Sequence, residues 1–161
     1  MNKELERIAR KVHEVFQKRG LTLSVAESCT GGLISHALTS QPGASSFFIA
    51  GAVTYAAAMK EKILGVSSST LARYGVVSER TAREMSEKMR ALSSTDFAVA
   101  TTGNLGPDVL EEKEKGLVYI AVSRKGETSA KELRLRGGRE GNRDDAAREA
   151  LLLLLEMAGK Q

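Results

Sequence analysis

Residues 24–32 read Ser-Val-Ala-Glu-Ser-Cys-Thr-Gly-Gly, and the interpretation of the fold starts from this stretch. The alternating apolar run 21–26 predicts a strand, and the run 33–38 that follows predicts a helix. The two glycines permit a tight turn and let a ligand approach the backbone closely. Such a junction directs backbone N–H groups and the positive end of a helix at one place. The stretch therefore predicts a site for an anion or a polarised carbonyl, although a helix cap at Ser28 or Thr30 would also explain it.

The composition is typical of one globular domain, which we expect to span residues 1–161. The chain is long enough for a sizeable core, and its 42% hydrophobic and 27% charged residues are ordinary proportions. One cysteine cannot form an internal disulfide, no apolar run is long enough to cross a bilayer, and the first residues predict an amphipathic helix rather than a secretory signal. We therefore expect a cytoplasmic protein that does not contact a membrane.

The sequence gives little sign of a metal site or a nucleic-acid site. Neither of the two histidines, His13 and His36, has a histidine or cysteine partner at ligand spacing, so we expect no metal and no cofactor, with an acidic Mg²⁺ site left open. The net charge is +4, and arginines crowd the last third of the chain. They are Arg134, Arg136, Arg139, Arg143 and Arg148. These could bind nucleic acid or one small phosphate group, but the 4% aromatic content and the lack of Trp disfavour nucleic acid as a partner.

Helical and strand patterns alternate along the chain. Helices are predicted over 3–18, 31–40, 56–64 and 79–92, with a short helical turn at 67–71 and a last helix near the C-terminus; strands are predicted over 21–26, 45–55, 96–101, 117–123 and 128–135. The expected fold is α/β: a three-layer α/β/α sandwich with a mixed, mostly parallel central sheet that ends in an antiparallel hairpin.

Three local patterns refine this expectation. Ser78 is a plausible N-cap for the helix that follows it, and Asn142 with Asp145 resembles a capping box for the last helix. Five consecutive leucines, 151–155, predict that the last helix is buried on more than one side, against the domain or a second subunit. Ligands in such sheets bind beyond the carboxyl ends of the parallel strands, so the loops 27–32 and 102–108 could share one cleft.

A serine nucleophile needs a base, and a lysine can supply it where burial lowers its pKa. Lys60 follows the apolar run 56–59, which makes partial burial plausible, and Tyr55 could orient it or relay a proton. A Ser–Lys–Tyr set suits amide hydrolysis, with N–H groups near Gly31-Gly32 or Gly103 stabilising the oxyanion. Each residue also has an ordinary interpretation: a surface lysine, a half-buried tyrosine and, at Ser45-Ser46, plain turn residues. Cys29 is either another nucleophile or a small buried thiol.

Several motifs follow one another in a familiar order. They are Ala-Glu-Ser-Cys-Thr-Gly-Gly at 26–32, Gly-x-Val-Thr-Tyr at 51–55 with Lys60, Leu-Gly-Val at 64–66, Gly-x-Val-Ser at 75–78 and Thr-Gly-x-x-Gly-Pro at 102–107. With them the sequence resembles the C-terminal domain of the competence/damage-inducible CinA family from about residue 4 to 158. The first motif is highly specific for that family.

The resemblance implies an α/β/α sandwich, usually oligomeric, so a homo-oligomer is expected. It implies a nicotinamide-mononucleotide amidohydrolase (deamidase), which hydrolyses the carboxamide to nicotinate mononucleotide and ammonia in pyridine-nucleotide salvage. The expected partner is thus a small nucleotide substrate, and no cofactor is implied. Many relatives carry a fused molybdopterin-binding-like domain, which this sequence lacks, so a stand-alone form is expected.

Site roles carry over from the family by position. The matching residues are Ser28, Ser45, Tyr55 and Lys60 for catalysis and Glu27, Thr30, Gly31, Gly32, Thr102, Gly103 and Arg139 for substrate binding. In this resemblance Arg139 suits the substrate phosphate. Ser45 as nucleophile with Lys60 as base is the favoured assignment, and Ser28 as nucleophile is the alternative.

The sequence departs from the family at several places. The family's glycine loop continues Gly-Pro-x-Gly-Gly, whereas here Gly106-Pro107-Asp108 runs into Val109-Leu110. Ala56-Ala57 replace the polar pair after the tyrosine, Ala44 replaces a serine, and Asn104 and Leu105 alter the loop after Thr102-Gly103. Missing glycines remove backbone freedom where phosphate or ribose would approach. The alternative function is therefore a non-catalytic or altered-specificity nucleotide-binding member of the same fold.

Overall fold

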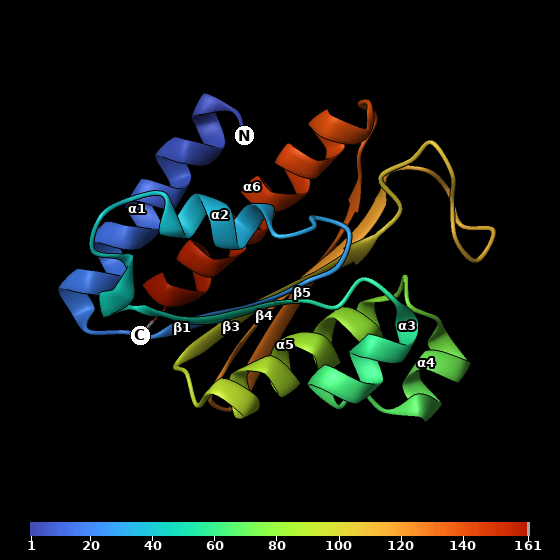
Figure 1. The fold of residues 1–161 in the computed structure, drawn as a ribbon, viewed down its shortest axis with the longest axis horizontal. Coiled ribbons are helices and arrows are strands. Elements are labelled where there is room, and N and C mark those ends of the chain that lie inside the picture. The colour runs from blue at the N-terminus through green and yellow to red at the C-terminus, as the bar shows by residue number, and fades with distance from the viewer. Residues whose placement is uncertain (161) are drawn as a thin grey trace.

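The computed structural model describes residues 1–160 and contains one five-stranded sheet with helices on both faces (Figure 1). The helical elements are α1 (Lys3–Arg19), α2 (Leu33–Thr39), the 3₁₀ turn η1 (Ala44–Ser46), α3 (Ala57–Met59), the π-helical segment η2 (Lys60–Leu64), α4 (Ser68–Tyr74), α5 (Glu79–Ser93) and α6 (Arg139–Gly159). The strands are β1 (Leu23–Glu27), β2 (Phe48–Val53), β3 (Phe97–Gly103), β4 (Leu117–Arg124) and β5 (Glu127–Arg134).

The strands lie in the order β2-β1-β3-β4-β5. β1 pairs in parallel with β2 and with β3, and the β4–β5 hairpin continues the sheet through antiparallel pairings. Helices α1, α2 and α6 cover one face, and α3, α4 and α5 cover the other (Figure 1). The predicted three-layer α/β fold with a mixed sheet is confirmed. Because β1, β2 and β3 run in the same direction, their carboxyl ends lie along one edge of the sheet.

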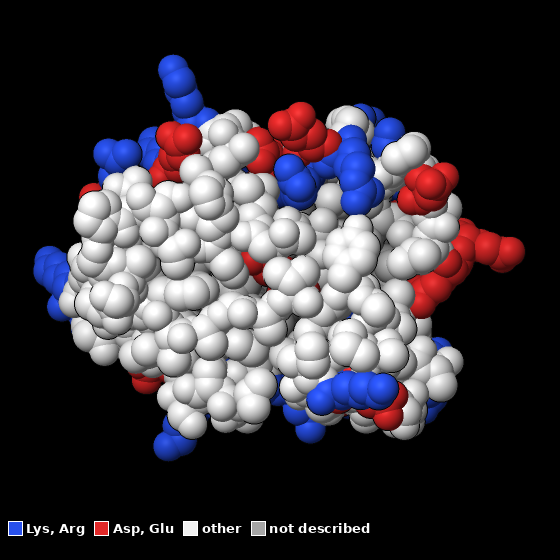
Figure 2. Space-filling view, viewed as in Figure 1, with Lys and Arg blue, Asp and Glu red and all other residues white. Residues whose placement is uncertain are grey.

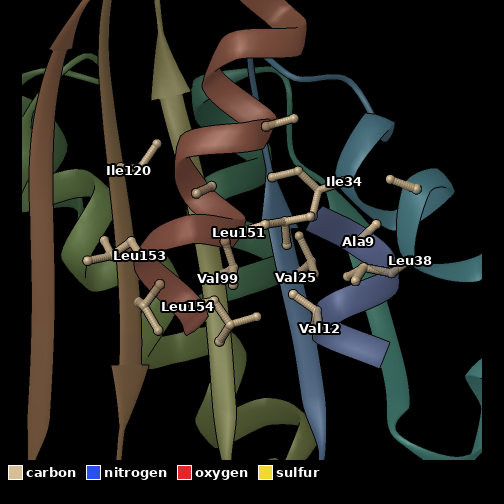
Figure 3. Close-up of a cluster of buried hydrophobic side chains, with 14 of the residues drawn as sticks. Ala9, Val12, Val25, Ile34, Leu38, Val99, Ile120, Leu151, Leu153 and Leu154 are labelled. Carbon is tan, nitrogen blue, oxygen red and sulfur yellow. The ribbon is translucent and has the colours of Figure 1, made fainter. Parts of the chain in front are cut away.

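The main core lies between the sheet and the layer formed by α1, α2 and α6. Leu151 and Leu154 of α6 pack with Val25 and Val99 of the sheet (Figure 3), and all four are fully buried. Burying a side chain of this size contributes roughly 1.5–3 kcal/mol. Leu152, in contrast, is 39% exposed. The leucine run is therefore buried largely within the chain itself, and the expected homo-oligomer stays a prediction.

The face seen in Figure 1 carries charged side chains mainly around its rim, and its middle is largely uncharged (Figure 2). Strand β2 is an edge strand, and its Ile49 and Val53 are about half exposed. No helix in residues 1–160 combines the length and the apolar character that crossing a membrane requires.

Residue types that commonly begin or end helices do so in α1 and α5. The Asn2 side chain accepts the N–H of Leu5 at the start of α1, and Gly20 ends that helix in the left-handed conformation. The predicted N-cap of α5 is confirmed, because the Ser78 hydroxyl accepts the N–H of Thr81. These contacts satisfy backbone groups that a helix end leaves unpaired.

The predicted capping box of the last helix is wrong. Helix α6 begins one turn earlier, at Arg139, and Asn142 lies inside it. The Asn142 side chain is fully buried, accepts the N–H of Gly137 and donates to the carbonyl of Leu105. It therefore ties the start of α6 to the loop that follows β3. The predicted strand over 45–55 is also shorter, because η1 occupies its first residues.

We expect Asn142→Ala to lower the free energy of unfolding by about 1–3 kcal/mol, since it leaves a buried N–H and a buried carbonyl without partners. Asp145→Ala removes only a surface pair with Arg148 and is the matched control, expected to stay within about 0.5 kcal/mol. Chemical denaturation of both variants measures the difference. A larger loss for the Asp145 variant would restore the capping-box interpretation.

Candidate active site

The candidate site lies where strands β1, β2 and β3 end. Ser28 directly follows β1, Thr54 and Tyr55 follow β2, and Thr102 and Gly103 end β3. The backbone continues to pair beyond the strands, because Ser28 donates its N–H to the Thr101 carbonyl and Thr54 donates its N–H to the Glu27 carbonyl. The two segments beside β1 are thereby held in register with it. The loops 27–32 and 102–108, expected to share one cleft, both contribute residues to one pocket, Cys29 from the first and Gly103 to Leu105 and Asp108 from the second.

The turn from β1 into α2 requires both of its glycines. Gly31 and Gly32 have φ values of +60° and +95°, in the region that disfavours any residue with a Cβ. Their N–H groups are already used, since Gly31 donates to the Ser28 carbonyl and Gly32 to the Glu27 carboxylate. The N–H groups expected to stabilise an oxyanion are therefore not those of Gly31 and Gly32. Within residues 1–160, the backbone N–H groups of Cys29 and Thr30 donate to no backbone carbonyl, and that of Cys29 contacts its own thiol.

Glu27 supports this turn from beneath. Its carboxylate is fully buried and accepts five hydrogen bonds, from the backbone N–H groups of Gly32, Ile34 and Ser35 and from two hydroxyls. The hydroxyls belong to Thr30 and Ser35. A carboxylate at the start of a helix satisfies unpaired N–H groups and is favoured by the helix dipole. With these donors its acceptor positions are occupied, so the geometry makes Glu27 a support for the turn.

Thr30 links the turn to β3. Its hydroxyl donates to Glu27 at 2.6 Å and lies 2.8 Å from the hydroxyl of Thr101. Because the single proton of Thr30 goes to the carboxylate, Thr101 is the donor in the second bond. Thr30 is fully buried, so its side chain fixes the turn from within.

Lys60 is the central side chain of the site. Its Nζ atom lies 2.8 Å from Ser28 Oγ, 2.7 Å from the Thr54 carbonyl oxygen and 3.3 Å from the Tyr55 carbonyl oxygen. The side chain is 1% exposed and forms no ion pair with any Asp or Glu in residues 1–160. The interpretation of Lys60 as a surface helix lysine is therefore wrong.

Burial makes the neutral form of Lys60 easier to reach than it is for a lysine in water. Burial lowers the pKa of the Lys60 amine to about 8, because removing a charged amine from water is unfavourable. A neutral amine has two N–H donors and one lone pair, and the carbonyls of Thr54 and Tyr55 can only accept. When protonated, the amine donates to all three oxygens; when neutral, it donates to the two carbonyls and its lone pair accepts the hydroxyl proton of Ser28. This arrangement is the hydrogen-bond geometry of a nucleophile beside its general base.

The local backbone explains how Lys60 reaches this position. It is the first residue of η2, a π-helical segment that directly continues α3, and such segments are rare and frequently occur at functional sites. Gly65 ends the segment with φ +78°, and Val66 donates back to the Lys60 carbonyl. The segment leaves the neighbouring Lys62 exposed while Lys60 is buried.

Ser45 does not meet Lys60 within this chain. Ser45 is exposed in η1, which precedes the first residue of β2. Lys60 contacts Thr54, which follows the last residue of β2. A strand of six residues spans about 16 Å, so the two ends of β2 are far apart. The Ser45–Lys60 pairing favoured from the sequence is thus not formed, and the serine that contacts Lys60 is Ser28.

Cys29 is held as a buried thiol. It is 6% exposed and belongs to the main core. Burial raises the pKa of its thiol to about 12, so the thiolate that a nucleophile requires is not populated near neutral pH. The geometry therefore favours the second interpretation of Cys29, a small buried residue beside the turn.

A pocket of about 210 Å³ is lined by Cys29, the residue after Ser28, and by Tyr55, whose carbonyl contacts Lys60; Ser28 and Lys60 themselves do not line it. It is lined by Cys29, Tyr55, Gly103, Asn104, Leu105, Asp108, Val109, Leu110 and Arg139. The Tyr55 side chain is largely exposed, and its hydroxyl accepts a hydrogen bond from Arg139 at 3.0 Å. Arg139 also donates to the Gly106 carbonyl at 2.7 Å. It therefore joins two walls of the pocket, and the carbonyl of Tyr55, not its hydroxyl, orients the lysine.

Thr102 and Gly103 shape the pocket from the end of β3. The Thr102 hydroxyl is buried and donates to the Val76 carbonyl. A Cβ at Gly103 would lie 2.6 Å from the Leu117 carbonyl oxygen, so the close pairing of β3 with β4 explains this glycine. Both residues hold neighbouring backbone in place.

The altered loop after β3 is fastened by side chains. The Asn104 side chain accepts the Leu110 N–H and donates to the Leu110 and Lys113 carbonyls. Positive φ values occur at Glu111 and Glu112, whereas Val109 and Leu110, where the family has glycines, do not adopt them. The loop thus turns without the family's glycine pair.

Glu111 fastens the same loop to the α4–α5 connection. Its carboxylate accepts the N–H groups of Val76 and Val77 and contacts the Lys113 amine, and these hydrogen bonds hold its pKa below the usual range. Gly75 makes room for it, because a Cβ there would lie 2.4 Å from the carboxylate oxygens. Glu111 and Lys113 therefore fix this loop against the α4–α5 connection. In residues 1–160, no three His, Cys, Asp or Glu side chains gather in a way that could hold a metal ion.

Comparison with known sequences gives a consistent result. The family model described as the CinA C-terminal domain matches residues 5–158. A protein named "Putative competence-damage inducible protein" from Caldanaerobacter subterraneus subsp. tengcongensis is 44% identical over 157 residues, which are 97% of this chain and 36% of the relative. A protein of the same name from Acetivibrio thermocellus is 47% identical over 139 residues, 86% of this chain and 33% of the relative. The chain therefore spans about a third of the length of these curated relatives.

Solved structures agree with the fold. The competence/damage inducible protein CihA from Agrobacterium tumefaciens has a TM-score of 0.94 at 39% identity, covering 98% of this chain and 97% of that one. A CinA superfamily protein from Klebsiella pneumoniae also has a TM-score of 0.94, at 31% identity with both chains fully covered.

We expect Glu27→Gln to lower the free energy of unfolding by about 2 kcal/mol, because the amide presents N–H donors to backbone N–H groups and a hydroxyl that need an acceptor. Thermal and chemical denaturation measure the loss. The control is Glu14→Gln on the exposed face of α1, which should not change stability. If the Glu27 variant is as stable as the parent but has lost affinity for nicotinamide mononucleotide, Glu27 is a ligand contact and not a support.

Proposed function

Because the chain belongs to the CinA C-terminal domain family and holds Ser28 against a buried lysine amine, we propose that it is an amidohydrolase of nicotinamide mononucleotide. The products are nicotinate mononucleotide and ammonia. The observation that carries the proposal is the 2.8 Å contact between Lys60 Nζ and Ser28 Oγ, with two carbonyl oxygens on the other side of the amine.

In the first step the Ser28 oxygen attacks the carboxamide carbon while neutral Lys60 takes the hydroxyl proton. The tetrahedral intermediate carries a negative oxygen, and the N–H groups of Cys29 and Thr30, which donate to no backbone carbonyl, follow the nucleophile directly in sequence. Protonated Lys60 then gives its proton to the departing nitrogen, which leaves as ammonia. An ester between Ser28 and the nicotinoyl group remains.

In the second step water attacks this ester. Lys60 takes a proton from the water and returns it to the Ser28 oxygen as the product leaves as the carboxylic acid, which then releases its proton to solvent, so the enzyme ends in its starting protonation state. Only the neutral form of Lys60 can begin the cycle. Activity therefore rises with pH as the amine loses its proton, around a pKa of about 8.

The direct test is ammonia release from nicotinamide mononucleotide by the purified chain and four variants. We expect Ser28→Ala and Lys60→Ala each to lower kcat by about 10²-fold or more, since each removes a group that acts in the chemical step. Lys62→Ala removes an exposed lysine from the same segment and should retain activity. The fourth variant, Ser45→Ala, decides between the two serines and is expected to stay active.

The outcomes separate the alternatives. Full activity in Lys60→Ala, with its fold retained by circular dichroism, would refute the proposed base. Loss of activity in Ser45→Ala but not in Ser28→Ala would assign the nucleophile to Ser45. Nucleotide binding without ammonia release by the parent protein would support the non-catalytic alternative suggested by the altered loop 104–110.

A further inference from the structure

Among residues 1–160, Asp108 is the only Asp or Glu that lines the pocket formed with Cys29, Tyr55 and Arg139. Its side chain is exposed and forms no ion pair or hydrogen bond with any group in residues 1–160. Other carboxylates of the same loop are engaged, such as Glu111 with two backbone N–H groups and Glu114 with Arg134. An unpaired carboxylate at a pocket wall attracts a cation or a hydroxyl donor.

Opposite charges share this pocket without neutralising each other. Asp108 and Arg139 both line it, and they form no ion pair with each other. Arg139 is instead engaged with the Gly106 carbonyl and the Tyr55 hydroxyl. The pocket therefore has a negative wall at Asp108 and a positive one at Arg139, which suits a ligand that carries both charges.

The rest of the wall is apolar and aromatic. Val109 is 42% exposed, Leu110 is 57% exposed and Tyr55 is 59% exposed. Leaving these groups in water is unfavourable, so a flat apolar ring that covers them gains free energy. The face of a tyrosine ring also attracts a cation, in addition to any effect of a carboxylate nearby.

From these observations we propose that Asp108 selects an amide-bearing ring with a positive charge, that is, an N-substituted pyridinium carboxamide, over its neutral counterpart. The proposal rests on the proposed amidohydrolase function for the position of the amide beside Ser28. Recognition of the ring is thus assigned to the loop after β3, at the residue that follows the cis peptide bond Gly106-Pro107. Arg139 uses two of its five N–H donors on Gly106 and Tyr55, and the remaining donors can bind the anionic end of the same ligand.

The test compares two probes that differ in charge, 1-methylnicotinamide and nicotinamide, by titration calorimetry. The protein carries Ser28→Ala, so that neither probe is turned over. We expect Asp108→Asn in this background to weaken binding of 1-methylnicotinamide about three- to fivefold, the size of a partly solvated charge pair, and to leave nicotinamide binding unchanged. Glu112→Gln removes an equal charge from an exposed position of the same loop and is the matched control.

Each other result overturns the proposal. Asp108 does not recognise the ring charge if Asp108→Asn lowers the affinity for both probes equally or for neither. The same conclusion follows if the cationic probe does not bind. Failure of the proposed function would look different, because binding with the expected charge preference would persist while the parent protein releases no ammonia.

Discussion

A lysine amine held out of water by two backbone carbonyl oxygens is the constraint on which the candidate site depends. Carbonyls only accept hydrogen bonds, so the lone pair of the neutral amine has one remaining direction, toward Ser28. The carbonyls belong to Thr54 and Tyr55, which follow an edge strand paired in parallel with β1. The direction of the sheet therefore places base and nucleophile together without any charged partner for Lys60.

The turn that presents Ser28 depends on a second constraint beneath it. Glu27 collects the unpaired N–H groups at the start of α2, and Gly31 and Gly32 allow the chain to reverse within a few residues. Polar residues in this stretch thus divide into two roles. Ser28 contacts the lysine, whereas Glu27 and Thr30 are buried and hold the turn.

The altered loop after β3 shows how a departure from a family pattern can be accommodated. Asn104 fastens the loop from inside, and Glu111 fastens it to the α4–α5 connection. Positive φ values move to Glu111 and Glu112, so Val109 and Leu110 are free to present apolar surface to the pocket. Val109 and Leu110 in place of glycines thus give the pocket an apolar wall.

Much of the fold was predictable from local pattern. The period of α1, the Ser78 cap and the run of leucines in α6 depend on neighbours in sequence, and the structure agrees with them. The sequence points to Lys60 but favours Ser45 as its partner and keeps Ser28 as the alternative, and it is Ser28 that contacts the lysine. That choice depends on which end of β2 lies beside Ser28, a question of strand order that no local signal answers. Asn142 was misassigned for a similar reason, because its partners include the distant Leu105.

To act as a base, Lys60 must lose its proton near physiological pH. A pH titration of the protein with ¹³C-labelled lysine, followed by NMR, tests this directly, and the spectrum of Lys60→Ala identifies the Lys60 signal. We expect a midpoint near 8 for Lys60. A midpoint near 10.5, the value of an unperturbed lysine, would contradict it.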